Sequence, residues 1–249
     1  MKAYPFPRAL LLALLLGLAA GAGAAPEADG AGALVDRGIA AFQAGRPAEA
    51  VRLWREAASR GDARAYLLLG AAYENGIGVK KDPKAAAGWY QRAASRGLPE
   101  AQYNLGLMYQ RGRGVARDLK RAAHWFRKAA EAGYAPAQNA LGVLYTQGAG
   151  VPKDPKEAVK WFRKAAAQGH TGAQFNLGYM YMKGEGVDPD NVFALQYFRM
   201  AAEKGNRPAQ RFLSKAYAKG WLGLPRDPAK SEYWRKRATG EIGPDQPPP

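Results

Sequence analysis

Two histidines are the residues of this chain whose type most readily suggests chemistry. His124 lies in the segment GRGVARDLKRAAHWFRKAAEAG, beside a Trp–Phe pair and several basic side chains, and His170 is the only other histidine. A zinc or copper site needs three or four converging ligands, usually including His or Cys at close spacing, and the chain has no cysteine. We therefore expect both histidines to be structural, with no metal and no cofactor.

The serines and the glycine loops also give little indication of catalysis. The serines are Ser59, Ser95, Ser214 and Ser231. None of them stands in the G-x-S-x-G context of a hydrolase nucleophile. The G-x-G-V loops resemble phosphate cradles, but they follow predicted helices rather than strands, and no G-K-[ST] comes after them. The sequence predicts a protein that is not an enzyme, and a hydrolase is the least supported alternative.

The segment around His124 is one copy of a repeat. Nearly the same residues, GAGVPKDPKEAVKWFRKAAAQG, begin at Gly148, 36 residues after Gly112. Alignment of the chain on itself at this interval places glycines in two columns. They are Gly76, Gly112, Gly148, Gly184 and Gly220, and Gly61, Gly97, Gly133, Gly169 and Gly205. A fixed period of this length is the signature of a repeat protein.

Each repeat unit reads as two helices. In AQYNLGLMYQRG the residues Ala101, Leu105 and Tyr109 fall on one helical face. Asp-Pro pairs such as 154–155 predict the start of the second helix, and Gly169 predicts its end. A unit of this size cannot bury its apolar faces alone, so the units are expected to stack.

A glycine recurs inside the first helix, as at Gly106. Such a glycine costs about 1 kcal/mol relative to alanine, so it needs a reason. We interpret it as close approach of the second helix through an alanine column, which consists of Ala86, Ala122, Ala158 and Ala194. The space between units is expected to be filled by a second column, Trp89, Trp125, Trp161, Tyr197 and Trp234.

The unit A-x-x-x-L-G-x-x-Y-x-x-G-x-G-V-x-x-D-x-x-x-A-x-x-W-[FY]-x-x-A-A-x-x-G resembles the Sel-like repeat (SLR) of the tetratricopeptide superfamily. Residues 101–133 and 137–169 fit this pattern almost without exception, and the rest of 34–240 fits it more loosely. The resemblance implies an all-α, right-handed α-α superhelical solenoid of helical hairpins, with one short N-terminal unit and five units of about 36 residues. It also implies an adaptor that binds partner proteins in a groove.

The ends of the chain differ from the repeats. Residues 1–24 carry Lys2, Arg8 and a short apolar run, which predicts a secretory signal peptide, with an uncleaved anchor as the alternative. Residues 25–33 read as a flexible linker, and the Pro-rich tail 241–249 as disordered. Export to the periplasm or beyond is therefore expected. Family members that are exported by bacteria are often tied to envelope signalling, exopolysaccharide control or host contact.

Partner binding is expected at positions whose identity packing does not dictate. In tetratricopeptide-like repeats the first helices line the concave surface, so the resemblance places the binding residues around the Leu-Gly pair of each first helix. They are Tyr103, Asn104, Leu107, Arg111, Asn139, Val143, Phe175, Asn176, Tyr179, Lys183 and Arg211. Asn104, Asn139 and Asn176 could clamp the backbone of an extended peptide. Asn104 and Asn176 could instead serve the fold, and both interpretations stay open.

Basic residues recur by column. The net charge is +16, and it is still +14 without Lys2 and Arg8, which favours acidic partners. The basic ladder, as we call these columns, consists of Arg55, Lys81, Arg117, Arg127, Lys153, Arg163 and Arg199. It is either a solvated face or a stripe for an anionic polysaccharide or cell-wall glycan. Nucleic acid fits the charge but not the export signal, and no transmembrane span is expected after signal cleavage.

Overall fold

The protein is described here by a computed structural model, which places residues 30–247 and 249. The expected signal peptide and the first part of the expected linker lie outside these residues. The described chain divides into two compact units, the first ending at Trp125 and the second beginning at Phe126. Among the described residues there are α-helices and one short 3-10 helix, and no strand. The predicted all-α class is confirmed.

The helices are short and nearly equal in length. The first unit contains α2 (Ala31–Gln43), α3 (Pro47–Ser59), α4 (Ala63–Asn75), α5 (Pro83–Ser95) and α6 (Pro99–Arg111). Helix α7 (Leu119–Glu131) spans the boundary. The second unit contains α8 (Ala135–Gln147), α9 (Pro155–Ala167), α10 (Thr171–Lys183), α11 (Asn191–Glu203), α12 (Arg207–Lys219), η1 (Trp221–Gly223) and α13 (Pro228–Thr239).

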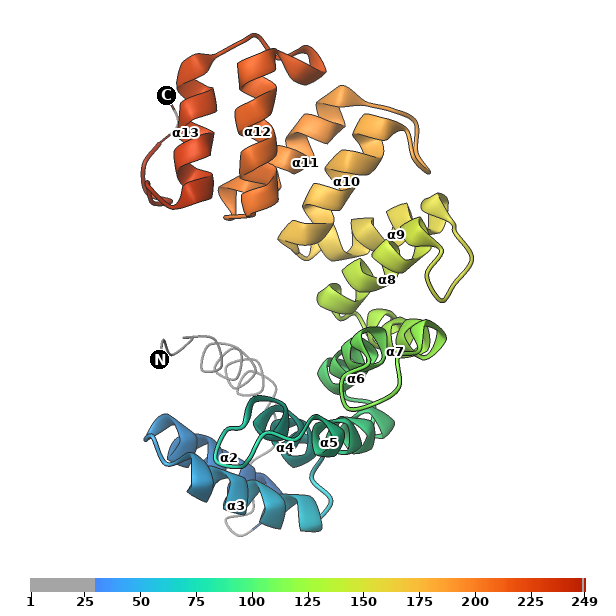
Figure 1. Ribbon diagram of the computed structural model, residues 1–249, viewed down its shortest axis with the longest axis vertical. Helices are drawn as coiled ribbons and strands as arrows, with labels where there is room; N and C mark the ends of the chain where they lie inside the picture. The colour runs from blue at the N-terminus through green and yellow to red at the C-terminus, as the bar shows by residue number, and fades with distance from the viewer. Residues whose placement is uncertain (1–29, 248) are drawn as a thin grey trace. The chain divides into compact units, whose positions relative to one another are not determined.

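Within each unit, consecutive helices pack as hairpins, and each hairpin packs on the next. In the first unit the hairpins are α2/α3 and α4/α5, and α3 contacts α4 while α5 contacts α6. In the second unit they are α8/α9, α10/α11 and α12/α13, joined through α9 with α10 and α11 with α12 (Figure 1). Each contact joins neighbours in sequence, which is the defining property of a solenoid. The predicted helical-hairpin solenoid is confirmed.

The predicted helix boundaries rest on side-chain caps and glycines. The Asp82 carboxylate accepts hydrogen bonds from the backbone N–H groups of Lys84 and Ala85 at 3.0 Å, and Asp154 accepts one from Glu157 at the same distance. These bonds satisfy N–H groups that have no partner inside the helix. Gly148 ends α8 with a φ of 67°, a left-handed conformation that glycine adopts without steric cost.

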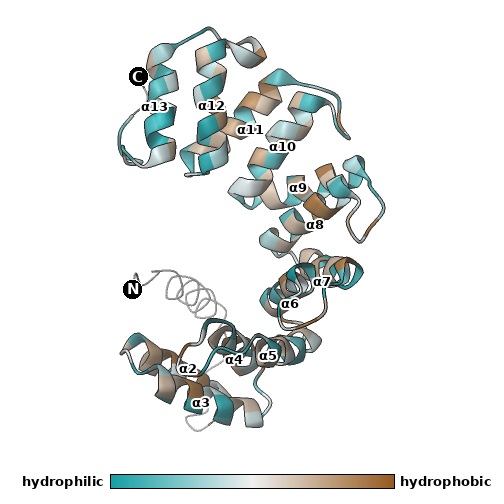
Figure 2. Cartoon of the chain, viewed as in Figure 1, coloured by the Kyte–Doolittle hydropathy of each residue, from teal (hydrophilic) through white to brown (hydrophobic). Residues whose placement is uncertain are grey.

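The Trp column is not the most deeply buried aromatic column of the repeats. The residues that lie fully inside are the ones directly after the Trp column in each repeat, namely Tyr90, Phe126, Phe162 and Phe198, together with Trp54. A Cβ atom added at Gly142 would lie 2.6 Å from Cε1 of Phe162. The recurrent glycine of the first helix therefore makes room for an aromatic ring, and at Gly178 an added Cβ would also lie 3.1 Å from the backbone oxygen of Ala194, in the expected alanine column. Hydrophobic and hydrophilic residues are mixed along individual helices, as this two-sided packing requires (Figure 2).

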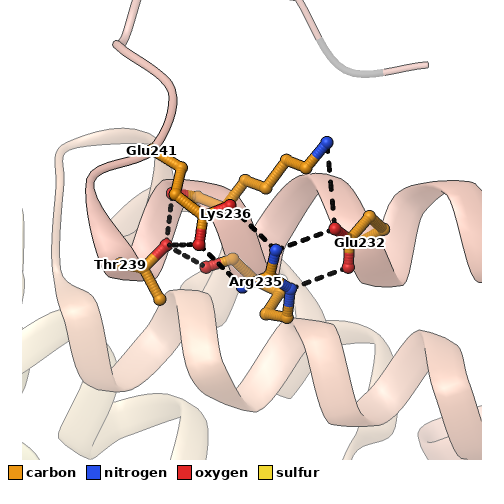
Figure 3. A network of polar contacts seen from close by, with 5 residues as sticks. All are labelled: Glu232, Arg235, Lys236, Thr239 and Glu241. Atoms are coloured by element: carbon orange, nitrogen blue, oxygen red, sulfur yellow. Dashed lines mark hydrogen bonds and ion pairs between the residues drawn. The ribbon is translucent and has the colours of Figure 1, made fainter.

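Both ends of the described chain form local structure. Helix α2 begins at Ala31, inside the linker expected at 25–33. Arg235 of α13 donates hydrogen bonds to Glu232 in the same helix and to Glu241 in the tail at 2.8–2.9 Å (Figure 3). The Tyr233 hydroxyl donates to the backbone oxygen of Gln246 at 2.9 Å. A guanidinium with two carboxylate partners thus holds the turn after α13.

Candidate functional site

The first helices of the second unit are joined by a pair of asparagines. Nδ2 of Asn176 on α10 donates a hydrogen bond to Oδ1 of Asn139 on α8, at 2.9 Å. Both side chains are half-buried. Each carboxamide has two donors and one acceptor group, so the N–H donors of Asn139 and the Oδ1 of Asn176 are left for other partners. The bond links α8 with α10, and the remaining donors and acceptor of the pair can still contact a partner.

A pocket of about 250 Å³ opens beside this pair. Its lining includes three of the expected binding residues, Val143, Asn176 and Tyr179, together with the buried side chains Phe162 and Met180. It also includes Thr146, Gln147 and Glu185. An apolar floor with a few polar groups at the edge is the usual composition of a binding pocket.

The expected residues of this unit lie on α8, α10 and α12. Tyr179 is 44% exposed, and Nζ of Lys183 lies 5.8 Å from its ring centre. Arg211 is exposed on α12. Phe175 is half-buried, with its ring 5.5 Å from that of Phe198, so it is also part of the core. We call these seven residues of α8, α10 and α12 the first-helix face: Asn139, Val143, Phe175, Asn176, Tyr179, Lys183 and Arg211.

The remaining expected residues belong to the first unit and lie on α6. Tyr103, Asn104 and Leu107 are half-buried, and Arg111 is exposed. Burial raises the pKa of the Tyr103 phenol, and the charge of Arg111 opposes this shift. The phenol therefore stays protonated and can donate a hydrogen bond at neutral pH.

The helical members of the basic ladder contact tyrosines of the next repeat. Arg163 donates to the Tyr181 hydroxyl at 2.8 Å, and Arg127 donates to that of Tyr145 at 2.7 Å. Two further pairs have the same sequence spacing, Arg55 with Tyr73 at 2.6 Å and Arg199 with Tyr217 at 3.2 Å. These four arginines thus have a structural role that the sequence analysis did not anticipate.

The loop members of the ladder lie against the glycine turns. A Cβ atom added at Gly76 or Gly148 would lie 3.2 Å from the Cβ of Lys81 or Lys153. Nε of Arg117 donates to the backbone oxygen of Gln110 at 3.2 Å. All three side chains are exposed, so their charges remain available at the surface.

The two histidines have separate, local surroundings. Nδ1 of His170 accepts a hydrogen bond from the backbone N–H of Ala173 at 3.1 Å, which caps α10. Burial lowers the pKa of this imidazole and so favours the neutral form that the cap requires. His124 is exposed, with its ring 5.3 Å from that of Trp125. Within the described residues, no group of three or more His, Cys, Asp or Glu side chains could hold a metal ion.

A polar cluster in the first unit escaped the sequence analysis. The Tyr90 hydroxyl donates to Oε2 of Glu74 at 3.0 Å, and Nη1 of Arg113 lies 3.4 Å from Oε1 of the same carboxylate. Burial, followed by the charge of Glu74, raises the pKa of Tyr90 well above its usual range. The available signal was the tyrosine itself, because Phe162 and Phe198 occupy its column elsewhere.

Of the helices in the described part of the chain, none has the length and apolar character needed to cross a bilayer.

Comparisons with known proteins agree with this architecture. The model of the Sel1 repeat family matches residues 45–62, 63–98, 99–134, 135–170, 171–206 and 207–239. A Sel1 repeat protein from Oxalobacter formigenes is 37% identical, with a TM-score of 0.75, and the alignment covers 84% of this chain and 86% of that one. An immunity protein from Pseudomonas aeruginosa is 26% identical, with a TM-score of 0.55, and the alignment covers 90% and 87% of the two chains.

A protective antigen with an SLR fold from uropathogenic Escherichia coli is 32% identical, with a TM-score of 0.75. The alignment covers 85% of this chain but only 46% of the antigen, so the chain spans about half of that protein's length. A search of curated proteins found no significant match. The family match extends over most of the sequence and coincides with the helical hairpins. This chain therefore belongs to the Sel1 repeat family.

Proposed function

We propose that this protein is an adaptor that binds an extended segment of a partner protein along its first-helix face and does so without catalysis. Sel1 repeats generally mediate protein–protein interactions, and their fold is generally a non-catalytic scaffold. The observation that carries the proposal is the asparagine pair Asn139–Asn176 beside the pocket lined by Val143 and Tyr179.

The chemistry of this face suits an extended peptide. Such a segment exposes backbone N–H and C=O groups, which carboxamides can match as acceptors and donors. The Oδ1 of Asn176 and the amide N–H groups of Asn139, which the bond between the two side chains does not use, support this role. The pocket then accepts one side chain of the segment, and Tyr179 offers a partly exposed ring for packing.

We further propose that the adaptor acts in the bacterial envelope after export. Support for this step comes from the sequence alone, from the basic and apolar residues of 1–24. The absence of cysteine agrees with a fold that depends wholly on packing. Binding to an anionic glycan stays a prediction that rests on the net charge alone. Four arginines of the basic ladder donate hydrogen bonds to tyrosines, so their recurrence also has a structural explanation.

Site-specific photocrosslinking tests the proposal. A photoreactive phenylalanine analogue placed at Tyr179 should crosslink a defined protein in intact cells. The matched control places it at Gln196, an exposed residue of the second helix α11. Capture from position 179 but not 196 supports the proposal. Equal capture from both positions, or from 196 alone, contradicts it.

A further inference from the structure

Two sites in this chain are equivalent by the repeat, and they carry different side chains. The polar cluster of the first unit lies exactly two repeats before the pocket of the second unit. Its members Glu74, Tyr90 and Arg113 therefore occupy the repeat positions of Thr146, Phe162 and Glu185. Because the backbone is repeated, the two sets of side chains can be compared directly. Those of the first unit fill the space over the aromatic ring, and those of the second unit leave a pocket there.

In the first unit the space is occupied by the chain itself. Arg113 comes from the loop between α6 and α7, and Glu74 comes from α4 of the preceding hairpin. The guanidinium reaches the carboxylate at 3.4 Å, while the Tyr90 hydroxyl donates to the other carboxylate oxygen. A basic side chain thus bridges neighbouring hairpins over a buried aromatic ring.

In the second unit no such bridge exists and the charge is reversed. Thr146 replaces the glutamate, and its hydroxyl donates to the backbone oxygen of Val143 at 2.8 Å. Glu185 replaces the arginine, and in the described part of the chain its carboxylate forms no ion pair. The space remains a pocket of about 250 Å³ with the Phe162 ring at its floor.

We infer that this pocket binds a basic side chain, arginine or lysine, contributed by the partner segment. The inference rests on the proposed function and names the side chain that the pocket selects. The aliphatic stem would lie against Phe162 and Met180, and the cationic head would pair with Glu185 at the rim, as Arg113 pairs with Glu74 in the first unit.

The charge of the loop beside the pocket favours a basic side chain, although the whole chain is basic. The loop 184–190 carries three carboxylates and no basic residue, whereas the equivalent loop 112–118 carries two arginines and one aspartate. One of the three carboxylates, Asp190, caps α11 by accepting from Val192 at 2.8 Å. Lys183 is the basic residue nearest in sequence, and its Nζ lies over the Tyr179 ring. The loop therefore presents Glu185 and Asp188 to an incoming cation.

The test uses two synthetic peptides, blocked at both ends, that differ only at the centre. One carries arginine, and the other carries citrulline, which has the same shape without the charge. Methyl resonances of Val143 and Met180 in the full chain report on the pocket. We expect saturable shifts with the arginine peptide and affinity about tenfold lower for the citrulline peptide, as for the loss of one charged hydrogen bond.

Two variants complete the test. Glu185→Gln should bind both peptides equally, and at the level of the citrulline peptide on the native chain. Thr146→Glu combined with Glu185→Arg should refill the pocket as in the first unit and abolish binding of the arginine peptide, with circular dichroism confirming the native helix content. Equal affinity of the native chain for both peptides, or binding of neither, overturns the inference. Photocrosslinking from Tyr179 decides the proposed function independently, because it needs no particular side chain in the partner.

Discussion

The guanidinium of Arg163 on α9 donates a hydrogen bond to the Tyr181 hydroxyl on α10, at 2.8 Å. The bond joins the second helix of one repeat to the first helix of the next, and Arg55, Arg127 and Arg199 form the same bond with their own tyrosines. A ladder that looks like a ligand-binding stripe in the sequence is therefore also a series of links between repeats.

Removal of this link should weaken the second unit modestly. Tyr181→Phe keeps the ring, which stacks on Tyr197 at 5.8 Å, and deletes only the hydroxyl. We expect a loss of about 1 kcal/mol in unfolding free energy, since Arg163 is exposed and regains water. A double-mutant cycle with Arg163→Ala, measured by urea denaturation, should show that the two effects overlap. Strict additivity of the two substitutions would contradict the link.

Alanine at two helical glycines should have opposite effects. Gly142→Ala would place its Cβ atom 2.6 Å from the Phe162 ring, and we expect a destabilisation of about 1–3 kcal/mol from overpacking. The matched control is Gly88→Ala, in the middle of α5, where nothing lies within 4 Å of an added Cβ. There we expect a gain of about 1 kcal/mol from helix propensity. Urea denaturation of both variants checks the prediction, and a stabilising Gly142→Ala would refute the packing role of that glycine.

The cap at His170 should make stability depend on pH. Burial depresses the pKa of the folded imidazole below the usual 6.5, so the unfolded chain takes up a proton first as the pH falls. The stabilisation is fully present above pH 6.5 and is lost as the pH falls through the folded pKa, because protonated Nδ1 cannot accept from Ala173.

The variant His170→Asn isolates this effect. Asparagine is already the cap at the equivalent position of the next repeat, where Asn206 accepts from Ala209 at 2.9 Å. The difference in denaturation midpoint between about pH 8 and about pH 5 should be smaller in His170→Asn than in the native chain. An identical pH dependence of the two proteins would rule out the cap as its source.

Substitutions of Tyr90 and Glu74 should lower the unfolding free energy by different amounts. Tyr90→Phe restores the residue type of other repeats and leaves Glu74 paired with Arg113, so we expect a loss of about 1 kcal/mol. Glu74→Ala leaves a buried tyrosine hydroxyl without its acceptor, and we expect a loss of about 1–3 kcal/mol. Chemical denaturation compares the two, and a greater loss in Tyr90→Phe would contradict the arrangement.

The sequence was sufficient to predict the hairpins, because their signals are local. Asp154 and Gly169 mark the ends of a helix through backbone chemistry that depends on neighbouring residues only. The ring under Gly142 was not accessible in the same way. The sequence indicated the alanine column there, whereas Phe162 lies against this glycine, and packing across the hairpin decides which side chain faces it.

The candidate site was predictable in outline and not in detail. Three of the residues expected to bind a partner, Val143, Asn176 and Tyr179, line one pocket, and their role in binding stays a prediction. The contribution of Glu185 was missed because it comes from a loop that the repeat pattern explains as a turn. The role of Glu185 becomes apparent only by comparison with Arg113, which at the equivalent position of the first unit fills the space and pairs with Glu74.

The central claim is that a partner segment lies along the first-helix face. Hydrogen–deuterium exchange of the full chain, alone and with the protein captured from Tyr179, tests it most directly. Binding at this face predicts slower exchange in α8, α10 and α12, with the exposed turns of α9, α11 and α13 unchanged. Protection confined to the second helices α9, α11 and α13 would contradict the claim.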